Sequence, residues 1–142
     1  RLVGSEMCIR DRDLTEVKQI FKNDFATYVA KVDIVKKAEI LKGTIAISTT
    51  EENYDDMPVI AAQAADELLN ITGILASFVL CKVEDVVMIS GRSMGDINVQ
   101  AILEKVGGGG HLTFAGAQLA GITIDEAKEK LIQSINEYFG NE

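Results

Sequence analysis

The chain has 142 residues, which suits one compact domain, and 47% of them are hydrophobic, which excludes a disordered or low-complexity chain. Acidic residues outnumber basic ones by 22 to 14, so the formal net charge is -8 at pH 7. This charge disfavours a broad surface for long nucleic acids, because such binding depends on cations that displace counterions from phosphates, but it still allows a local pocket for one anionic ligand.

The sequence offers few metal ligands and no targeting segment. His111 is its only histidine, and Cys8 and Cys81 are too far apart in the sequence to form a paired ligand motif. We therefore expect no metal site in this chain, and we interpret Cys81, which lies in an apolar run, as a core residue. No signal peptide and no run of about 18 apolar residues is present, so we expect a cytoplasmic location without membrane contact.

The N-terminal part divides into a leader and a helical segment. Residues 1–12 show neither strand alternation nor helical periodicity, and we interpret them as a non-native leader. The domain then covers residues 13–142. Apolar residues from Leu14 onward keep a spacing of three and four, which predicts one or two helices that end near Ala38.

The middle of the chain combines strand and helix signals. Residues 40–48 predict a strand hairpin or a bulged strand, and the acidic residues 51–56 predict a solvated loop. Pro58 suits the first turn of a helix, where its missing N–H costs nothing. Residues 74–82 and 86–90 are rich in β-branched side chains and predict an antiparallel hairpin.

The C-terminal part begins with a predicted loop over residues 91–95. Asp96 is the predicted N-cap of the next helix, which ends at Gly107, and residues 112–119 predict a strand. A capping box at Thr123 starts the last helix. Because strands joined by hairpins cannot all be parallel, we expect an α/β fold, as a single compact domain with a mixed sheet of about four or five strands flanked by helices.

Four consecutive glycines, residues 107–110, lie directly before His111. Without Cβ atoms, their N–H groups can approach a ligand closely, as in a backbone nest that binds phosphate. The alternative is a helix C-cap followed by a slack loop, which requires a single glycine. His111 would either bond to phosphate or a leaving oxygen, or orient itself on the backbone.

A second group of polar residues precedes the glycines. Arg92 has the planar donor fork that suits phosphate, and Ser93 adds a hydroxyl, although Arg92 could equally pair with a nearby carboxylate on the surface. Asn98 could contact a base edge or a ribose, or it could cap the helix. For Gln100 a solvated position on that helix is favoured.

Three short motifs occur in a fixed order: residues 89–93 (ISGRS), residues 97–100 (INVQ), and residues 107–111 (GGGGH) followed by AGA at 115–117. Together they resemble the C-terminal DHH-associated domain of DHH-family phosphoesterases, with the Asn-Val-Gln spelling most similar to GdpP-type phosphodiesterases of cyclic di-AMP. The resemblance covers about residues 13–139. Gly91 departs from it, because many relatives have alanine there.

The resemblance implies the substrate-binding half of a manganese-dependent phosphodiesterase for cyclic di-AMP or a related cyclic or short linear dinucleotide. A preceding DHH domain would hold two Mn²⁺ ions, and the parent protein would carry a membrane anchor in its N-terminal region. This chain alone would bind weakly and hydrolyse nothing, with an assisting role for His111 in the whole enzyme. The implied substrate-binding residues are Arg92, Ser93, Asn98, Gly108, Gly109, Gly110 and His111.

Two other functions share the same phosphate-binding motifs. The chain could belong to a nanoRNase or RecJ-like exonuclease that acts on short oligonucleotides, or it could be a non-catalytic module that senses a nucleotide. The apolar stripe of the leading helices also suggests a homodimer, although a helical bundle within one chain would bury it equally well.

Overall fold

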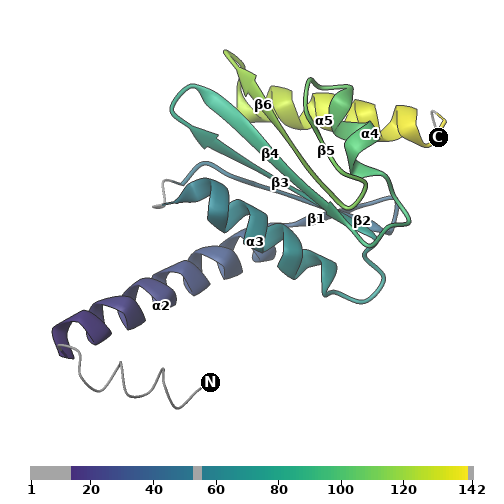
Figure 1. Cartoon of the computed structure of the whole chain (residues 1–142). Helices are drawn as coiled ribbons and strands as arrows, with labels where there is room; N and C mark the ends of the chain where they lie inside the picture. The colour runs from purple at the N-terminus through teal and green to yellow at the C-terminus, as the bar shows by residue number, and fades with distance from the viewer. Residues whose placement is uncertain (1–13, 53–55, 141–142) are drawn as a thin grey trace.

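The computed structural model describes residues 14–52 and 56–140, so the leader predicted over residues 1–12 lies outside the described part. The fold is a six-stranded sheet in the order β1-β2-β3-β4-β6-β5, with helices on both faces (Figure 1). The elements are α2 (Leu14–Lys36), β1 (Glu39–Leu41), β2 (Ile45–Thr50), α3 (Met57–Leu69), β3 (Ala76–Val83), β4 (Val86–Ser93), α4 (Val99–Glu104), β5 (Gly109–Gly110), β6 (Phe114–Ala120) and α5 (Ile124–Tyr138).

The sheet is mixed, as the sequence predicts. Strands β2 and β3 run parallel and are connected through α3, while the four other strand pairs of the described sheet are antiparallel. The sequence predicts four or five strands, and the sixth is β5, which lies within the glycine run. Glycines carry no side-chain alternation, so a strand made of them leaves no pattern to detect.

Two local predictions need correction. The segment 91–95, predicted as a loop, begins inside β4, which continues to Ser93 and pairs Arg92 with Phe114 of β6. Asn98, not Asp96, is the N-cap of α4, and its side-chain oxygen accepts a hydrogen bond from the Ala101 N–H at 3.1 Å. Asparagine and aspartate cap helices about equally well, so residue type alone could not choose between them.

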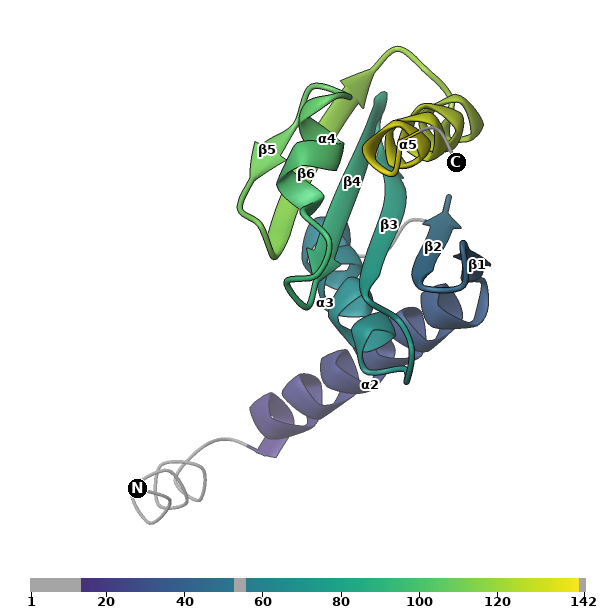
Figure 2. The same cartoon turned by 90° about the vertical axis from the view of Figure 1, so that its right-hand side faces the viewer.

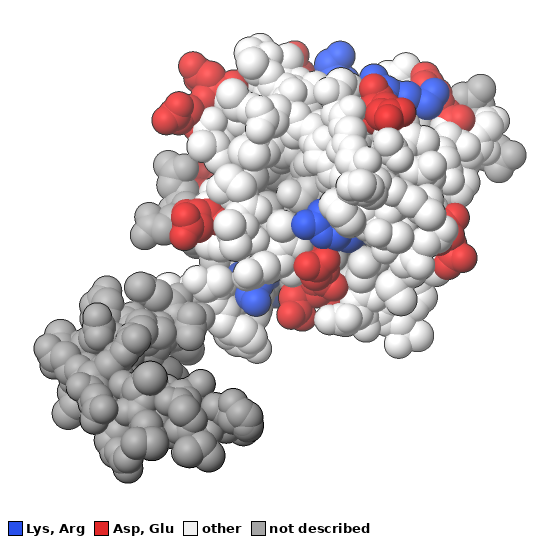
Figure 3. Space-filling view, viewed as in Figure 1, with Lys and Arg blue, Asp and Glu red and all other residues white. Residues whose placement is uncertain are grey.

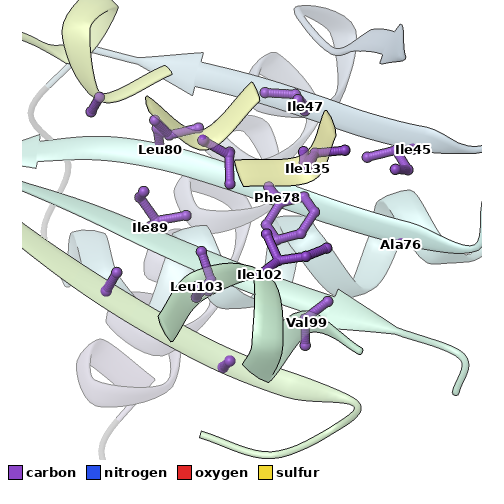
Figure 4. Close-up of a cluster of buried hydrophobic side chains, with 14 of the residues drawn as sticks. Ile45, Ile47, Ala76, Phe78, Leu80, Ile89, Val99, Ile102, Leu103 and Ile135 are labelled. Atoms are coloured by element: carbon purple, nitrogen blue, oxygen red, sulfur yellow. The ribbon is translucent and has the colours of Figure 1, made fainter. Parts of the chain in front are cut away.

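Side-chain alternation along the central strands divides the core between the two faces of the sheet. Phe78 and Leu80 of β3 pack under α4 and α5, in the cluster drawn in Figure 4. Val79 and Cys81, the alternate residues, pack under α2 and α3. Figure 2 shows the two helix layers on opposite sides of the strands. Each face of β3 is therefore buried, which accounts for its almost continuous apolar sequence.

Two buried hydroxyl groups on the strands bind α2 and α3 to the sheet through hydrogen bonds. The Ser48 hydroxyl donates to the carbonyl oxygen of Ile34 at 2.5 Å, and the Ser77 hydroxyl donates to that of Ala65 at 2.6 Å. These bonds satisfy polar groups that would be costly to bury unpaired. The first bond joins α2 to β2, and the second joins α3 to β3; α3 also contacts β4. Strand β6 keeps an exposed face beyond α3, and this open face carries the candidate site.

Within the described residues, no helix combines the length and the apolar character needed to cross a membrane. Helix α2 has 23 residues, but charged side chains recur along it.

Cys81 provides a test of the core. Its thiol is buried in β3, and burial raises its pKa to about 11. Unfolding restores an ordinary thiol pKa, so the stability that depends on Cys81 is complete below about pH 8.5 and is lost as the pH rises towards 11. In a Cys8→Ser background, we expect Cys81 to react slowly with a disulfide reagent until denaturant is added, and rapid labelling of the native chain would contradict its burial.

Candidate functional site

The glycine run begins as the C-terminal cap of α4. Gly107 has a φ of 92°, and its N–H donates to the Glu104 carbonyl at 3.1 Å. The N–H of Gly108 donates to the Leu103 carbonyl at 2.8 Å. These two bonds and the left-handed glycine define a Schellman motif. The C-cap that the sequence allows for this run is therefore present, and Gly107 supplies it.

The next glycines form an edge strand and not a slack loop. Gly109 lies opposite Gly116 and Gly110 opposite Ala115 in the pairing of β5 with β6. A Cβ added at Gly108 would collide with the Gly116 carbonyl and lie 2.7 Å from the Ala117 Cβ, and one added at Gly110 would lie 2.5 Å from the Ala115 Cα. Gly108 and Gly110 are therefore required by the close approach of β5 to β6.

Arg92 lies on the open face of β4, opposite Phe114 of β6. Its Nε is 3.1 Å from Oδ1 of Asp66 in α3, and its Nη1 donates to the Gly91 carbonyl at 2.9 Å. The guanidinium carbon lies 6.0 Å from the centroid of the Phe114 ring. The surface ion pair that the sequence allows for Arg92 is thus formed, but Asp66 is 63% exposed and such pairs are weak.

Phe114 is a neighbour of both Arg92 and His111. The His111 and Phe114 ring centroids are 4.5 Å apart, and the His111 N–H donates to the Phe114 carbonyl at 2.6 Å. The Phe114 side chain is 49% exposed. The sequence motifs do not single out Phe114. The signal in the sequence that could have identified Phe114 is the alternation along β6, which buries Ala115 and Ala117 and exposes Phe114.

Arg92, Phe114 and His111 form a row of neighbouring side chains. Ser93 and Asn98 stabilise the loops around this row. The Ser93 hydroxyl is buried, donates to the Leu112 carbonyl at 3.4 Å and accepts from the Gly95 N–H at 3.0 Å. The Asn98 side chain caps α4, and its backbone N–H donates to the Tyr138 hydroxyl at 3.0 Å. Of the predicted residues, the structure brings Arg92 and His111 together beside Phe114, whereas Ser93 and Asn98 have structural contacts.

A groove of about 540 Å³ lies along the open face beside this row. Its lining comes from β4, β6 and the start of the glycine run: Met88, Ile89, Ser90, Gly107, Gly108, Gly109, Gly116, Ala117 and Gln118. In Figure 3 the acidic side chains are scattered around the view, and the basic ones form no continuous surface. Within residues 14–52 and 56–140, no group of three or more His, Cys, Asp or Glu residues is arranged to hold a metal ion.

The comparisons with known proteins agree on one family. Residues 42–141 match the DHHA1 domain. The chain is 44% identical over 128 residues to the cyclic-di-AMP phosphodiesterase GdpP of Geobacillus thermodenitrificans. These residues make up 89% of the chain and 20% of that protein. The chain is also 44% identical over 131 residues to the cyclic-di-AMP phosphodiesterase PdeA of Listeria monocytogenes, covering 92% of the chain and 20% of that protein. The chain thus spans about a fifth of these relatives.

A solved structure supports the same fold. An exopolyphosphatase-related protein from Bacteroides fragilis superposes with a TM-score of 0.71 at 18% identity, over 96% of this chain and 42% of that one. The resemblance stated from the three motifs is therefore confirmed at the level of family and fold.

The glycines offer a matched pair of substitutions. Gly108→Ala should lower the free energy of unfolding by about 1 to 3 kcal/mol, because its Cβ would overlap β6. Gly109→Ala should change it by less than about 0.5 kcal/mol, since a Cβ there meets nothing within 4 Å. Urea unfolding of both variants measures the difference. Equal losses would show that β5 does not approach β6 as described.

Proposed function

The chain belongs to the DHHA1 domain family, and from this we propose that it is the substrate-binding part of a phosphodiesterase that hydrolyses cyclic di-AMP or a related short dinucleotide. The observation that carries the proposal is the row Arg92, Phe114 and His111 at the end of the groove. A cation and an imidazole on either side of an exposed aromatic ring are complementary to the phosphate and base of a nucleotide.

Arg92 would bind the phosphate by exchanging partners. Its present partner, Asp66, is largely exposed and can return to water at small cost when a phosphate arrives. The guanidinium then offers a bidentate fork to two phosphate oxygens. Phe114, beside it, offers a ring face on which a base can stack.

The glycine strand would add backbone donors. Successive residues of a β-strand direct their N–H groups to opposite edges of the strand. Because the His111 N–H donates to β6, the N–H of Gly110 points to the free edge of β5, which is the last strand of the described sheet. Gly110 and the His111 imidazole would thus offer donors to a phosphate group at the free edge of β5.

The catalytic metals would be held elsewhere in the longer protein. The donor set of this chain does not fit a two-manganese centre, since it has one histidine and the described residues contain no cluster of ligands. We therefore assign the two Mn²⁺ ions to a DHH domain outside this chain, and to this chain the binding and orientation of the substrate. Manganese-dependent turnover by the purified chain would contradict this division. The cytoplasmic location and the membrane anchor of the parent protein stay predictions.

Calorimetric titration of the chain with cyclic di-AMP and with linear di-adenylate tests the site. Arg92→Ala should weaken binding at least tenfold, because it removes charge-assisted hydrogen bonds, and His111→Ala should weaken it several-fold. Lys128→Ala on α5 is the control, since it removes a partly buried cation that is paired with Glu39, and it should bind as the unmodified chain does.

The outcomes separate the candidate functions. Tighter binding of the linear dinucleotide would favour the exonuclease that acts on short oligonucleotides. Equal affinities for the Arg92→Ala and Lys128→Ala variants would remove Arg92 from the site.

The homodimer suggested by the leading helix is a further proposal. Phe25, Tyr28, Val29 and Val32 of α2 have the i, i+3, i+4, i+7 spacing of one helix face and are 37 to 66% exposed. The opposite face of α2 carries the buried Ile34. Figure 2 shows α2 extending away from the sheet, so a second copy could reach this outer face.

Light scattering after gel filtration tests the homodimer. We expect a dimer that Tyr28→Ser combined with Phe25→Ser converts to a monomer, because both changes remove apolar area from the outer face of α2. Val59→Ser, at an exposed apolar residue of α3, is the control and should leave the dimer unchanged. A monomer of unmodified chain at all concentrations would overturn the proposal.

A further inference from the structure

The groove is a continuation of the phosphate-binding row along two paired strands. In the pairing of β4 with β6, Arg92 lies opposite Phe114, Ser90 opposite Gly116 and Met88 opposite Gln118. Because strand residues two apart share a face, all three pairs belong to the open face of the sheet. Gln118 lies four residues from Phe114, which is about 13 Å along the strand. One end of this face therefore carries the cation, and the other end carries an amide.

Gly109 and Gly116 leave the floor of the groove without side chains, and the fold does not require glycine at either position. A Cβ added at Gly109 would meet nothing within 4 Å, and one added at Gly116 would meet the Ile89 carbonyl at 3.4 Å, an ordinary contact. Neither residue has a positive φ. Alanine would thus fit at both positions, in contrast to Gly108 and Gly110, whose Cβ atoms would overlap β6.

Glycine weakens a strand unless something requires its small size, for instance the close approach of a ligand. Gly116 is exposed, and although β5 approaches its carbonyl closely, a Cβ on Gly116 itself would have room, so the packing of β5 does not require glycine there. The space that a methyl group would fill at Gly116 belongs to the groove, whose lining includes both Gly109 and Gly116. The absence of side chains there leaves a flat floor of backbone atoms, which suits a planar ligand.

The walls of the groove match a nucleobase. The Gln118 amide presents an acceptor and two donors, the set that pairs with the N6 and N7 edge of adenine. The Gln118 side chain is exposed on the open face, so it can turn to a ligand. Met88 opposite it offers a thioether, which packs favourably against aromatic rings. The volume of about 540 Å³ lies in the range of small-molecule sites.

We propose that this groove is a base-binding subsite, in which a purine lies on Gly109 and Gly116 and Gln118 selects adenine over guanine. The inference rests on the proposed function, because the Arg92 end of the same face would hold the phosphate. Guanine presents O6, an acceptor, where adenine presents the N6 donor group, so its N7 and O6 edge offers two acceptors and no donor to the Gln118 amide. The groove would therefore set the base preference of the site, whereas Arg92 would bind phosphate whatever the base.

Titration of the chain with cyclic di-AMP and with cyclic di-GMP, at up to millimolar ligand and followed by calorimetry and by NMR shifts, tests this subsite. The unmodified chain should bind the adenine ligand at least tenfold more tightly. Gln118→Ala should reduce this preference to less than threefold, mainly by weakening the adenine complex. Gly116→Ala should weaken both complexes at least tenfold without lowering the unfolding temperature. Gln133→Ala, at an exposed glutamine of α5, is the control and should change neither affinity.

The failure of the subsite and the failure of the proposed function give different results. Arg92→Ala should weaken both ligands equally and keep their ratio. If Arg92→Ala abolishes binding while Gln118→Ala and Gly116→Ala bind as the unmodified chain does, the groove is not the base subsite but the phosphate site stands. If the unmodified chain shifts no resonance with either ligand, the proposed function fails and the subsite fails with it.

Discussion

The antiparallel pairing of β4 with β6 is the constraint on which the candidate site depends. It places Arg92 beside Phe114 and leaves one face of both strands in register over the length of the groove. Small residues make this pairing compatible with the helix layer behind it. A Cβ at Gly91 would lie 2.9 Å from the Phe78 ring, and Ala115 and Ala117 belong to the same buried cluster. The core therefore determines which residues of these strands can be large, and the large ones point to the open face.

The sheet is buried on both faces at β3, but one face of β6 is uncovered, as antiparallel strands allow. Helix α3 packs on β3 and β4, and the face of β6 beyond it stays exposed at Phe114, Gly116 and Gln118. A longer helix layer would close the groove. The relatives that the chain matches are about five times as long, so further parts of a longer protein can face this surface. Under the proposed function, the open face would bind the small ligand and would also be the surface that a catalytic domain meets.

The sequence predicts the elements better than it predicts the site. Apolar periodicity and the capping box at Thr123 locate the helices, because they report local hydrogen bonds and burial. Four glycines next to a histidine predict phosphate binding, but the pattern cannot separate Gly108, which β6 requires, from Gly109, which it does not. That distinction depends on a strand some ten residues away in the chain. Phe114 likewise lies opposite Arg92 only because β4 pairs with β6, and the local sequence does not show this.

The charge of the chain and the partners of Arg92 together favour a small ligand. A net charge of -8 repels a polyanion, whose many phosphates would each need a cation that the surface in Figure 3 does not offer in a continuous patch. A dinucleotide needs few cations, and it gains the rest of its binding from stacking and from neutral hydrogen bonds that are insensitive to net charge. Asp66 holds the Arg92 guanidinium in an ion pair that, under the proposed function, such a ligand would replace. Under the proposed function, Arg92 in an acidic chain would therefore select short nucleotides over long ones before any base is recognised.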